Sequence, residues 1–146
     1  MQLQTKLSLE PQLHNQIDYN SKLLLIGSCF TENIGTKLNY YKFQHILNPF
    51  GILFQPRAIE ALITNAINQK KYNESEIFFL NEQWHSFDAH SKLSHSNKNT
   101  LLNELNLAIH ITSQQLIESS HIILTLGTAW AYRHIESDPY VANCHK

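Results

Sequence analysis

One serine follows a short apolar run at a point where the periodicity of the chain changes. Leu23 to Ile26 are all apolar, Gly27 interrupts the run, and Ser28 comes next, ahead of a segment with helical spacing. This pattern is typical of a buried strand that turns sharply into a helix. The turn would place Ser28 at a helix N-terminus, where free N–H groups favour developing negative charge. Ser28 is therefore a candidate nucleophile, while the simpler interpretation makes it the N-cap of the helix.

The next residue, Cys29, is an alternative nucleophile at the same position. A helix N-terminus favours the thiolate form of a cysteine, which is the reactive form. A cysteine in such a place is more often a small buried residue, so the nucleophile is assigned to Ser28.

Glycines also follow two other apolar runs. Gly51 closes a turn that begins at Asn48, and Gly127 precedes Thr128 after a third run. The carboxyl ends of neighbouring parallel strands lie side by side, so these turns would flank Ser28. A serine nucleophile needs N–H or amide donors aimed at the oxyanion. We expect the N–H groups of Ser28 and Gly51, with a group of Gly127 or Thr128, to supply them; alternatively, each glycine only ends a strand.

A nucleophilic serine also needs a base within hydrogen-bond reach. His85 and His145 are the local candidates. His85 follows Trp84 in an aromatic-rich segment, which favours a substrate contact or a structural histidine over a base. His145 lies at the end of the chain and carries little weight. The candidate substrate contacts are Trp84, His85, Trp130, Asn143 and His145.

A metal site is a further alternative for the same segment. His85, Asp88 and His90 carry imidazole and carboxylate groups, which suit zinc. Their spacing matches no established motif, and loop histidines without a metal are the commoner case. We therefore expect neither a metal nor another cofactor.

Strands and helices alternate around these residues. Strands are predicted at 2–9, 23–26, 43–47 and 121–126, the last of them buried, and helices at 31–41, 56–69 and 100–119. Residues 76–88 favour irregular structure or a small hairpin, residues 91–99 a loop, and residues 130–143 a hairpin. The order predicts an α/β fold with a parallel sheet. Because the chain stops just after a strand, we expect residues 1–146 to form a single domain that is incomplete at its C-terminus.

Composition narrows the class of protein. The formal net charge is −1, with 42% hydrophobic and 16% charged residues, which argues against a nucleic-acid-binding protein. No apolar run approaches the roughly 20 residues of a membrane span, and the N-terminus lacks the apolar segment of a secretory signal. Two cysteines are too few for a disulfide scaffold. We expect a cytoplasmic protein that binds neither nucleic acid nor membrane, and the oligomeric state stays open.

The residues that begin at Gly27 resemble a known signature. Gly27-Ser28-Cys29-Phe30-Thr31-Glu32-Asn33-Ile34-Gly35 is similar to the motif that names the GSCFA domain family, with Thr31 in place of alanine. Further blocks resemble the family in its own order, at residues 48–54, 84–87, 127–130 and 142–146. The family is similar to the SGNH hydrolases. The resemblance implies a flavodoxin-like three-layer α/β/α sandwich and a serine esterase mechanism on a small acyl ester, with a carbohydrate as one possible carrier.

The resemblance also implies roles for single residues. Ser28 matches the nucleophile, Gly51 the oxyanion glycine of the second block, and Gly127 the start of the third block. The third block departs from the usual Gly-x-Asn-Asp, because Ala129 and Trp130 fill its last two positions. Three side chains are candidates to replace the missing asparagine donor: Thr128, Asn48 and Asn143.

The base that the superfamily carries in an Asp-x-x-His pair has no match after Trp130. We expect this base and its orienting acid beyond residue 146, and therefore little esterase activity from these 146 residues alone. The alternative function is a non-catalytic ligand- or carbohydrate-binding domain that keeps the hydrolase fold. In that case Trp84, Trp130 and Tyr132 would be stacking surfaces for a sugar.

Overall fold

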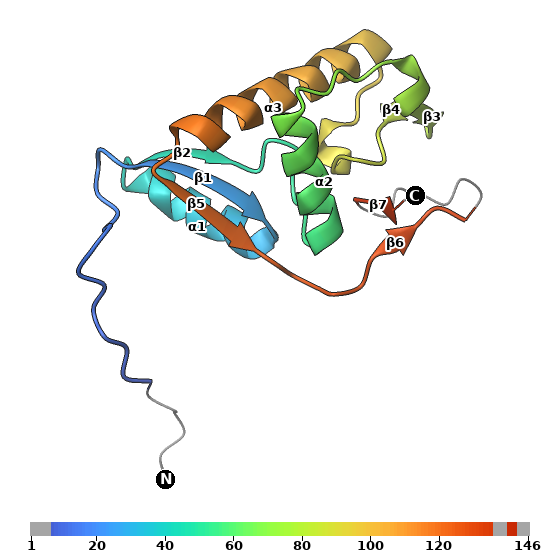
Figure 1. Cartoon of the computed structure of the whole chain (residues 1–146). Coiled ribbons are helices and arrows are strands. Elements are labelled where there is room, and N and C mark those ends of the chain that lie inside the picture. The colour runs from blue at the N-terminus through green and yellow to red at the C-terminus, as the bar shows by residue number, and fades with distance from the viewer. Residues whose placement is uncertain (1–6, 136–139, 143–146) are drawn as a thin grey trace.

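The computed structural model describes residues 7–135 and 140–142. Its central sheet holds three parallel strands in the order β2-β1-β5 (Figure 1): β1 (Lys22–Gly27), β2 (Gln44–Leu47) and β5 (His121–Thr125). The register pairs Leu24 of β1 with Ile46 on one side and with Ile122 on the other. The predicted α/β fold with a parallel sheet is confirmed, as are the three strands predicted from residue 23 onward.

Strand β1 forms the centre of the sheet because its side chains are apolar on both faces. The four residues from Leu23 to Ile26 are fully buried, as expected for a parallel strand that is covered on both sides. One face packs against α1 (Cys29–Tyr40), where Gly35 lies against the side chain of Leu47.

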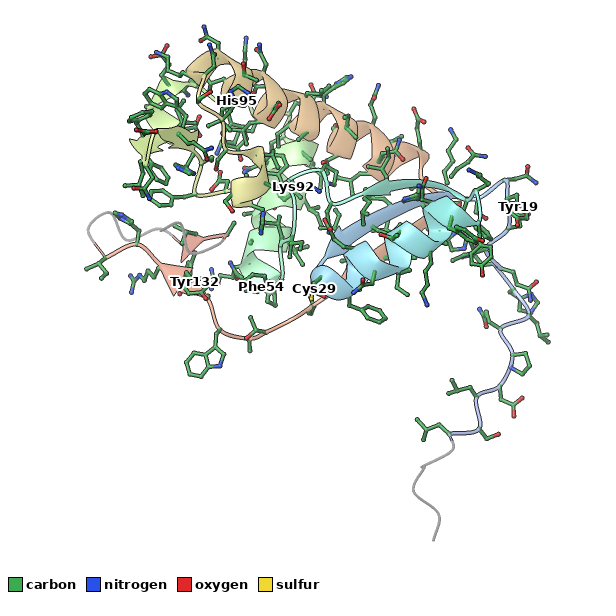
Figure 2. The ribbon with its side chains drawn as sticks, turned by 180° about the vertical axis from the view of Figure 1, so that it is seen from behind. Tyr19, Cys29, Phe54, Lys92, His95 and Tyr132 are labelled. Carbon is green, nitrogen blue, oxygen red and sulfur yellow. The ribbon has the colours of Figure 1, made fainter. Side chains whose placement is uncertain are left out.

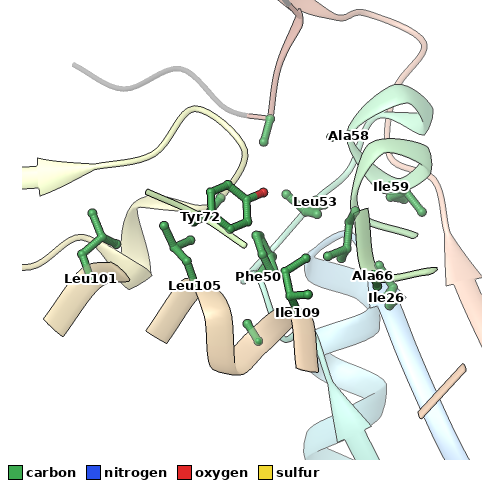
Figure 3. Packing of buried hydrophobic residues seen from close by; sticks show 14 of the residues in the cluster. Ile26, Phe50, Leu53, Ala58, Ile59, Ala66, Tyr72, Leu101, Leu105 and Ile109 are labelled. Atoms are coloured by element: carbon green, nitrogen blue, oxygen red, sulfur yellow. The ribbon is translucent and has the colours of Figure 1, made fainter. Parts of the chain in front are cut away.

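The other face of the sheet is covered by two helices, α2 (Pro56–Ile67) and α3 (Lys98–Glu118). Leu24 and Ile26 join residues of both helices in one buried cluster, part of which is shown in Figure 3. Pro56 occupies the first turn of α2, where its missing N–H is tolerated, and the Gln55 side chain caps that helix by accepting from Arg57 N. The three-layer α/β/α arrangement is thus confirmed.

The remaining elements are short. The antiparallel hairpin of β3 (Phe78–Leu80) and β4 (Gln83–His85) is flanked by the 3-10 turns η1 (Glu74–Glu76) and η2 (Ser91–Leu93). Strands β6 (Tyr132–Arg133) and β7 (Tyr140–Val141) also pair in antiparallel fashion. Both predicted hairpins are therefore present, although residues 136–139 and 143 lie outside the described part. None of the helices in the described ranges has the length and apolarity needed to cross a membrane.

Two expectations for strands need correction. Residues 7–9 of the predicted first strand have no strand structure, and its other residues lie outside the described part. The strand predicted at 121–126 exists as β5 but is not buried, since Ile122 and Leu124 are 45% and 47% exposed. The register places these two side chains on the same face as Leu24 and Ile26. Strand β5 lies at the edge of the sheet, where α2 and α3 do not fully cover it.

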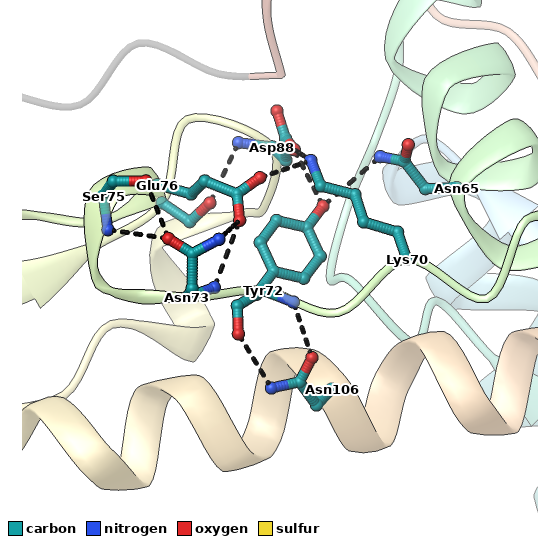
Figure 4. Close-up of polar contacts among 9 residues, drawn as sticks. Asn65, Lys70, Tyr72, Asn73, Ser75, Glu76, Asp88 and Asn106 are labelled. Carbon is teal, nitrogen blue, oxygen red and sulfur yellow. Dashed lines mark hydrogen bonds and ion pairs between the residues drawn. The ribbon is translucent and has the colours of Figure 1, made fainter.

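A buried tyrosine joins the segment after α2 to the residues that follow the hairpin. The hydroxyl of Tyr72 donates to Asp88 Oδ2 at 2.7 Å and accepts from Asn65 Nδ2 at 3.4 Å (Figure 4). The Lys70 ammonium lies 3.2 Å from the same carboxylate oxygen and 2.8 Å from Glu76 Oε1. Burial, followed by the charge of Asp88, raises the pKa of the Tyr72 hydroxyl. Burial lowers the pKa of Lys70, but its two carboxylate partners outweigh burial and raise it overall.

We expect Tyr72→Phe to lower the free energy of unfolding at pH 7 by about 1–2 kcal/mol, because the Asn65 amide and the Asp88 carboxylate lose a hydrogen-bond partner. The pKa of Tyr72 is higher in the folded chain than in the unfolded chain. Its contribution to stability is therefore complete below about pH 10 and is lost as the pH rises further. Urea unfolding of both proteins at pH 7 and above pH 10 checks this prediction. The stability difference between the two proteins should narrow at the higher pH, and a constant difference would contradict the assignment.

Candidate active site

Ser28 lies between the end of β1 and the start of α1, as predicted. It holds the N-cap position with extended backbone angles, but its side chain makes no capping hydrogen bond to the helix. Its hydroxyl instead lies 3.0 Å from Thr125 Oγ1 at the end of β5, and the residue is 8% exposed. Because the hydroxyl does not cap α1, the simpler interpretation of Ser28 does not account for its side chain.

Glycine is required immediately before Ser28. Gly27 has a φ of +151°, and a Cβ there would overlap the carbonyl oxygen of Thr125 and lie 2.8 Å from Thr125 N. Any L side chain would be strained at this φ and would push β1 away from β5. The close approach of the two strands brings Thr125 to Ser28, whose N–H donates to the Thr125 carbonyl at 3.1 Å.

Thr125 and Thr31 are site residues that the sequence reasoning missed. Thr125 Oγ1 accepts from Ser28 N at 3.0 Å and contacts the hydroxyls of both Ser28 and Thr31. Thr31 is fully buried in the first turn of α1. The available signals were a hydroxyl residue inside an apolar strand and a second one three positions after Ser28.

Asn48 brings an unpaired donor to the same end of β1. Its Oδ1 accepts from Gly27 N at 2.8 Å, which fixes the amide beside the residue that precedes Ser28. Its Nδ2 is buried and is without a hydrogen-bond partner among the described residues. A buried donor left unpaired costs about 1–3 kcal/mol, so such groups call for an explanation. Its backbone, with a φ of +43°, suits asparagine better than most residues.

The main-chain donors predicted for the oxyanion all have acceptors in this structure. Gly51 N donates to Asn48 O at 2.8 Å, which closes the predicted turn. Gly127 N and Thr128 N donate to Phe54 O at 2.7 and 3.3 Å. Gly127 nevertheless lies near Ser28, since a Cβ on Gly127 would lie 3.3 Å from Ser28 Cβ and 2.9 Å from Phe54 Cβ, whereas Gly51 lies against the His90 side chain. Figure 2 labels Phe54 at this end of the sheet.

Cys29 is the first residue of α1, and it is exposed. Figure 2 labels it close to Phe54, on the same side of the molecule. The sequence analysis favoured a small buried cysteine over a nucleophile at this position, but Cys29 is exposed, so that interpretation is wrong. Cys29 therefore remains the competitor of Ser28 that an experiment must separate.

His85 has one partner in its own hairpin and another just after η2. Its Nδ1 lies 2.6 Å from Ser94 Oγ and its Nε2 lies 3.0 Å from Leu80 O, and the residue is 7% exposed. Figures 1 and 2 both show the β3–β4 hairpin away from the end of β1. These contacts favour the structural interpretation of His85.

The metal alternative is not supported. Within residues 7–135 and 140–142, no three His, Cys, Asp or Glu side chains gather in a way that could hold a metal ion. His90 Nδ1 accepts from Lys92 N at 3.1 Å, and Asp88 binds Lys70 and Tyr72. The groups of His85, Asp88 and His90 thus face separate partners.

The candidate substrate contacts divide into three groups. Trp84 lies against Phe79 in the hairpin, with ring centroids 5.2 Å apart, and is therefore distant from Ser28 together with His85. Trp130 follows the Gly127 turn and is 86% exposed. Asn143 and His145 lie outside the described residues.

Comparison with known proteins gives a single result. The model of the GSCFA family matches residues 22–146, which is most of the chain and includes every described element. No curated protein matches, and no solved structure matches.

Proposed function

Because this chain belongs to the GSCFA family, we propose that it acts as a serine hydrolase of the SGNH type, in which Ser28 attacks the carbonyl carbon of a small acyl ester. One observation carries the proposal. The Ser28 hydroxyl is not used to cap α1, and it lies at the same strand end as the unpaired amide of Asn48. A nucleophile and an unpaired amide donor at one strand end are two of the parts that acyl transfer needs, the third being a base.

The proposed reaction has two steps. Ser28 Oγ forms a bond to the ester carbonyl carbon as its proton passes to a base, and the tetrahedral intermediate then expels the alcohol, which takes a proton. Water attacks the acyl-serine in the second step, releasing the carboxylic acid and restoring the serine. The hydroxyl of Ser28 meets Thr125 Oγ1 in this structure. The proposal therefore takes the base from a histidine outside the described residues.

Asn48 Nδ2 is the proposed main donor to the oxyanion. It has no hydrogen-bond partner among the described residues, whereas the N–H groups of Gly51 and Gly127 already donate to carbonyl oxygens. Because Nδ2 is buried, its role requires this end of β1 to open enough for a substrate oxygen to reach it. A role for either glycine would require its N–H to exchange that carbonyl for the substrate. Asn48 would also replace the asparagine that the third block lacks.

We expect Asn48→Asp to lower kcat for ester hydrolysis by about 10²–10³-fold, the usual cost of losing one oxyanion donor. Aspartate tolerates the positive φ of position 48 and keeps an oxygen to accept from Gly27 N. The change replaces the Nδ2 donor with a carboxylate oxygen, and both the lost donor and the added negative charge disfavour the oxyanion. Steady-state kinetics of the full-length protein, with a thermal unfolding control, provide the measurement. A wild-type kcat in a folded variant would remove Asn48 from the oxyanion site.

The substrate class is proposed as a small acyl ester, free or on a carbohydrate. The test measures acetate released from an acetylated sugar and from a simple aryl acetate by the full-length protein. Release above the buffer rate supports the hydrolase, while an intact ester in the presence of saturating protein contradicts it. We further propose a cytoplasmic location, on the composition of the chain.

The second candidate is a non-catalytic carbohydrate-binding domain. The observation in its favour is Trp130, an indole that is 86% exposed just after the Gly127 turn, since an exposed indole suits stacking on a sugar ring. Calorimetric titration with acetylated and unacetylated sugars separates the two functions. Binding without turnover, lost in Trp130→Ala and kept in Ser28→Ala, would favour the binding domain.

A further inference from the structure

We propose that Thr125 is a positioning residue that donates a hydrogen bond to Ser28 Oγ and so directs the serine proton outward to the base. This inference rests on the proposed role of Ser28 as nucleophile. Thr125 is the last residue of β5, and the register pairs it with Gly27. Its hydroxyl is therefore fixed by a strand rather than by a mobile loop.

The hydrogen bonds around Thr125 allow only a limited number of proton arrangements. A hydroxyl has one hydrogen and two acceptor lone pairs. Thr125 Oγ1 uses one lone pair to accept from Ser28 N at 3.0 Å, through an N–H that is shared with the Thr125 carbonyl oxygen at 3.1 Å. One hydrogen and one lone pair remain for the hydroxyls of Ser28 and Thr31, both of which contact this oxygen. Thr125 thus donates to one of them and accepts from the other.

Only one of the two arrangements is productive. If Ser28 donates to Thr125, the serine proton points into the protein, away from any base on the substrate side. If Thr31 donates to Thr125 and Thr125 donates to Ser28, the serine proton is free to leave. Thr31 is fully buried, and Thr125 Oγ1 is the partner that the structure shows for its hydroxyl. The Thr31 proton is thus well placed to begin a chain of hydrogen bonds that runs from Thr31 through Thr125 to Ser28.

The productive arrangement also gains strength during the reaction. Negative charge builds on Ser28 Oγ as its proton leaves, and a hydrogen bond to a charged oxygen is stronger than one to a neutral oxygen. The Thr125 hydrogen is already aimed at that oxygen, and the chain from Thr31 polarises it further. An interaction that is stronger in the transition state than in the ground state raises kcat rather than lowering KM.

The test compares Thr125→Val, which removes the hydroxyl at nearly constant shape, with Thr125→Ser, which keeps it. The matched control is Thr112→Val, because Thr112 is a threonine remote from Ser28 whose hydroxyl donates to Ala108 O within α3; it is fully buried, whereas Thr125 is partly buried. The readouts are kcat, KM and the pH dependence of the rate at which a fluorophosphonate modifies the full-length protein. We expect Thr125→Val to lower kcat and the labelling rate by roughly 10- to 100-fold with little change in KM. In the pH profile, the labelling rate of Thr125→Val should rise at a higher pH than the labelling rate of the wild-type protein.

The control and the rescue variant should stay within a few-fold of wild type. A Thr125→Val protein that is labelled at the wild-type rate would overturn the role of Thr125 and leave Ser28 in place. Wild-type protein that is labelled no faster than Ser28→Ala would overturn the proposed function itself. If Thr125→Val does not fold, Thr125→Cys provides the comparison, because its weak S–H donor should give a rate well below that of Thr125→Ser. Equal rates for these two variants would contradict the inference.

Discussion

Ser28→Ala is expected to lower the rate of acetyl-ester hydrolysis by the full-length protein by about a thousandfold or more. The change removes the oxygen that would form the acyl-serine, so only transition-state binding by the remaining groups can accelerate the reaction. Within the described part of the chain, the hydroxyl makes one side-chain hydrogen bond, to Thr125, and does not cap α1. The loss of activity should therefore come with only a small change in stability.

Cys29→Ala is the matched control for this prediction. It removes the other nucleophilic side chain at the same helix terminus, on a residue that is exposed. Its rate should stay within a few-fold of wild type. Equal rates for wild type and Ser28→Ala would reject Ser28 as the nucleophile, and a loss confined to Cys29→Ala would transfer the role to the cysteine.

Gly27→Ala is expected to have the largest effect on stability, lowering the free energy of unfolding by roughly 3 kcal/mol or more. Two costs add at this position. The φ of +151° is strained for alanine, and the new Cβ would overlap main-chain atoms of Thr125, which cannot move without opening the pairing of β1 with β5. Chemical unfolding monitored by circular dichroism measures the change.

Gly35→Ala provides the comparison. Its Cβ would also meet a neighbour, the Leu47 side chain at 2.6 Å, but a side chain can shift where a strand backbone cannot. Gly35 lies inside α1, where alanine is favoured over glycine by about 1 kcal/mol. We expect a clearly smaller loss than for Gly27→Ala. A Gly27→Ala protein as stable as Gly35→Ala would contradict the close approach of the two strands.

The sequence was a good guide where apolar pattern and turn chemistry agree. The run from Leu23 to Ile26 predicted the central strand, because a strand covered on both faces is apolar at every position. Gly27 and Ser28 predicted the turn into α1, and Asn48 with Gly51 predicted the turn after β2. These features depend on residues that are close together in the chain, so they can be recognised in a single sequence.

Features that depend on neighbours were harder to predict. An apolar run does not tell an edge strand from a central one, which explains why β5 is more exposed than expected at Ile122 and Leu124. The sequence left His85 open between a substrate contact and a structural histidine, and the pairing of β3 with β4 away from Ser28 favours the structural interpretation.

Hydrogen-bond partners on neighbouring strands are even harder to predict from the sequence. Thr125 is one hydroxyl in an apolar strand, and only the register with Gly27 brings it to Ser28. In the same way, Asn48 Nδ2 is left without a partner because Oδ1 is held by Gly27 N and the amide is buried. A sequence shows neither of these facts.

Mapping the site of covalent modification tests the central proposal most directly. The full-length protein is treated with an alkyl fluorophosphonate, digested, and examined by tandem mass spectrometry. We predict a single adduct on Ser28, absent from Ser28→Ala and present in Cys29→Ala. An adduct on another residue, or an unmodified Ser28 in folded protein, would contradict the assignment of Ser28 as the nucleophile.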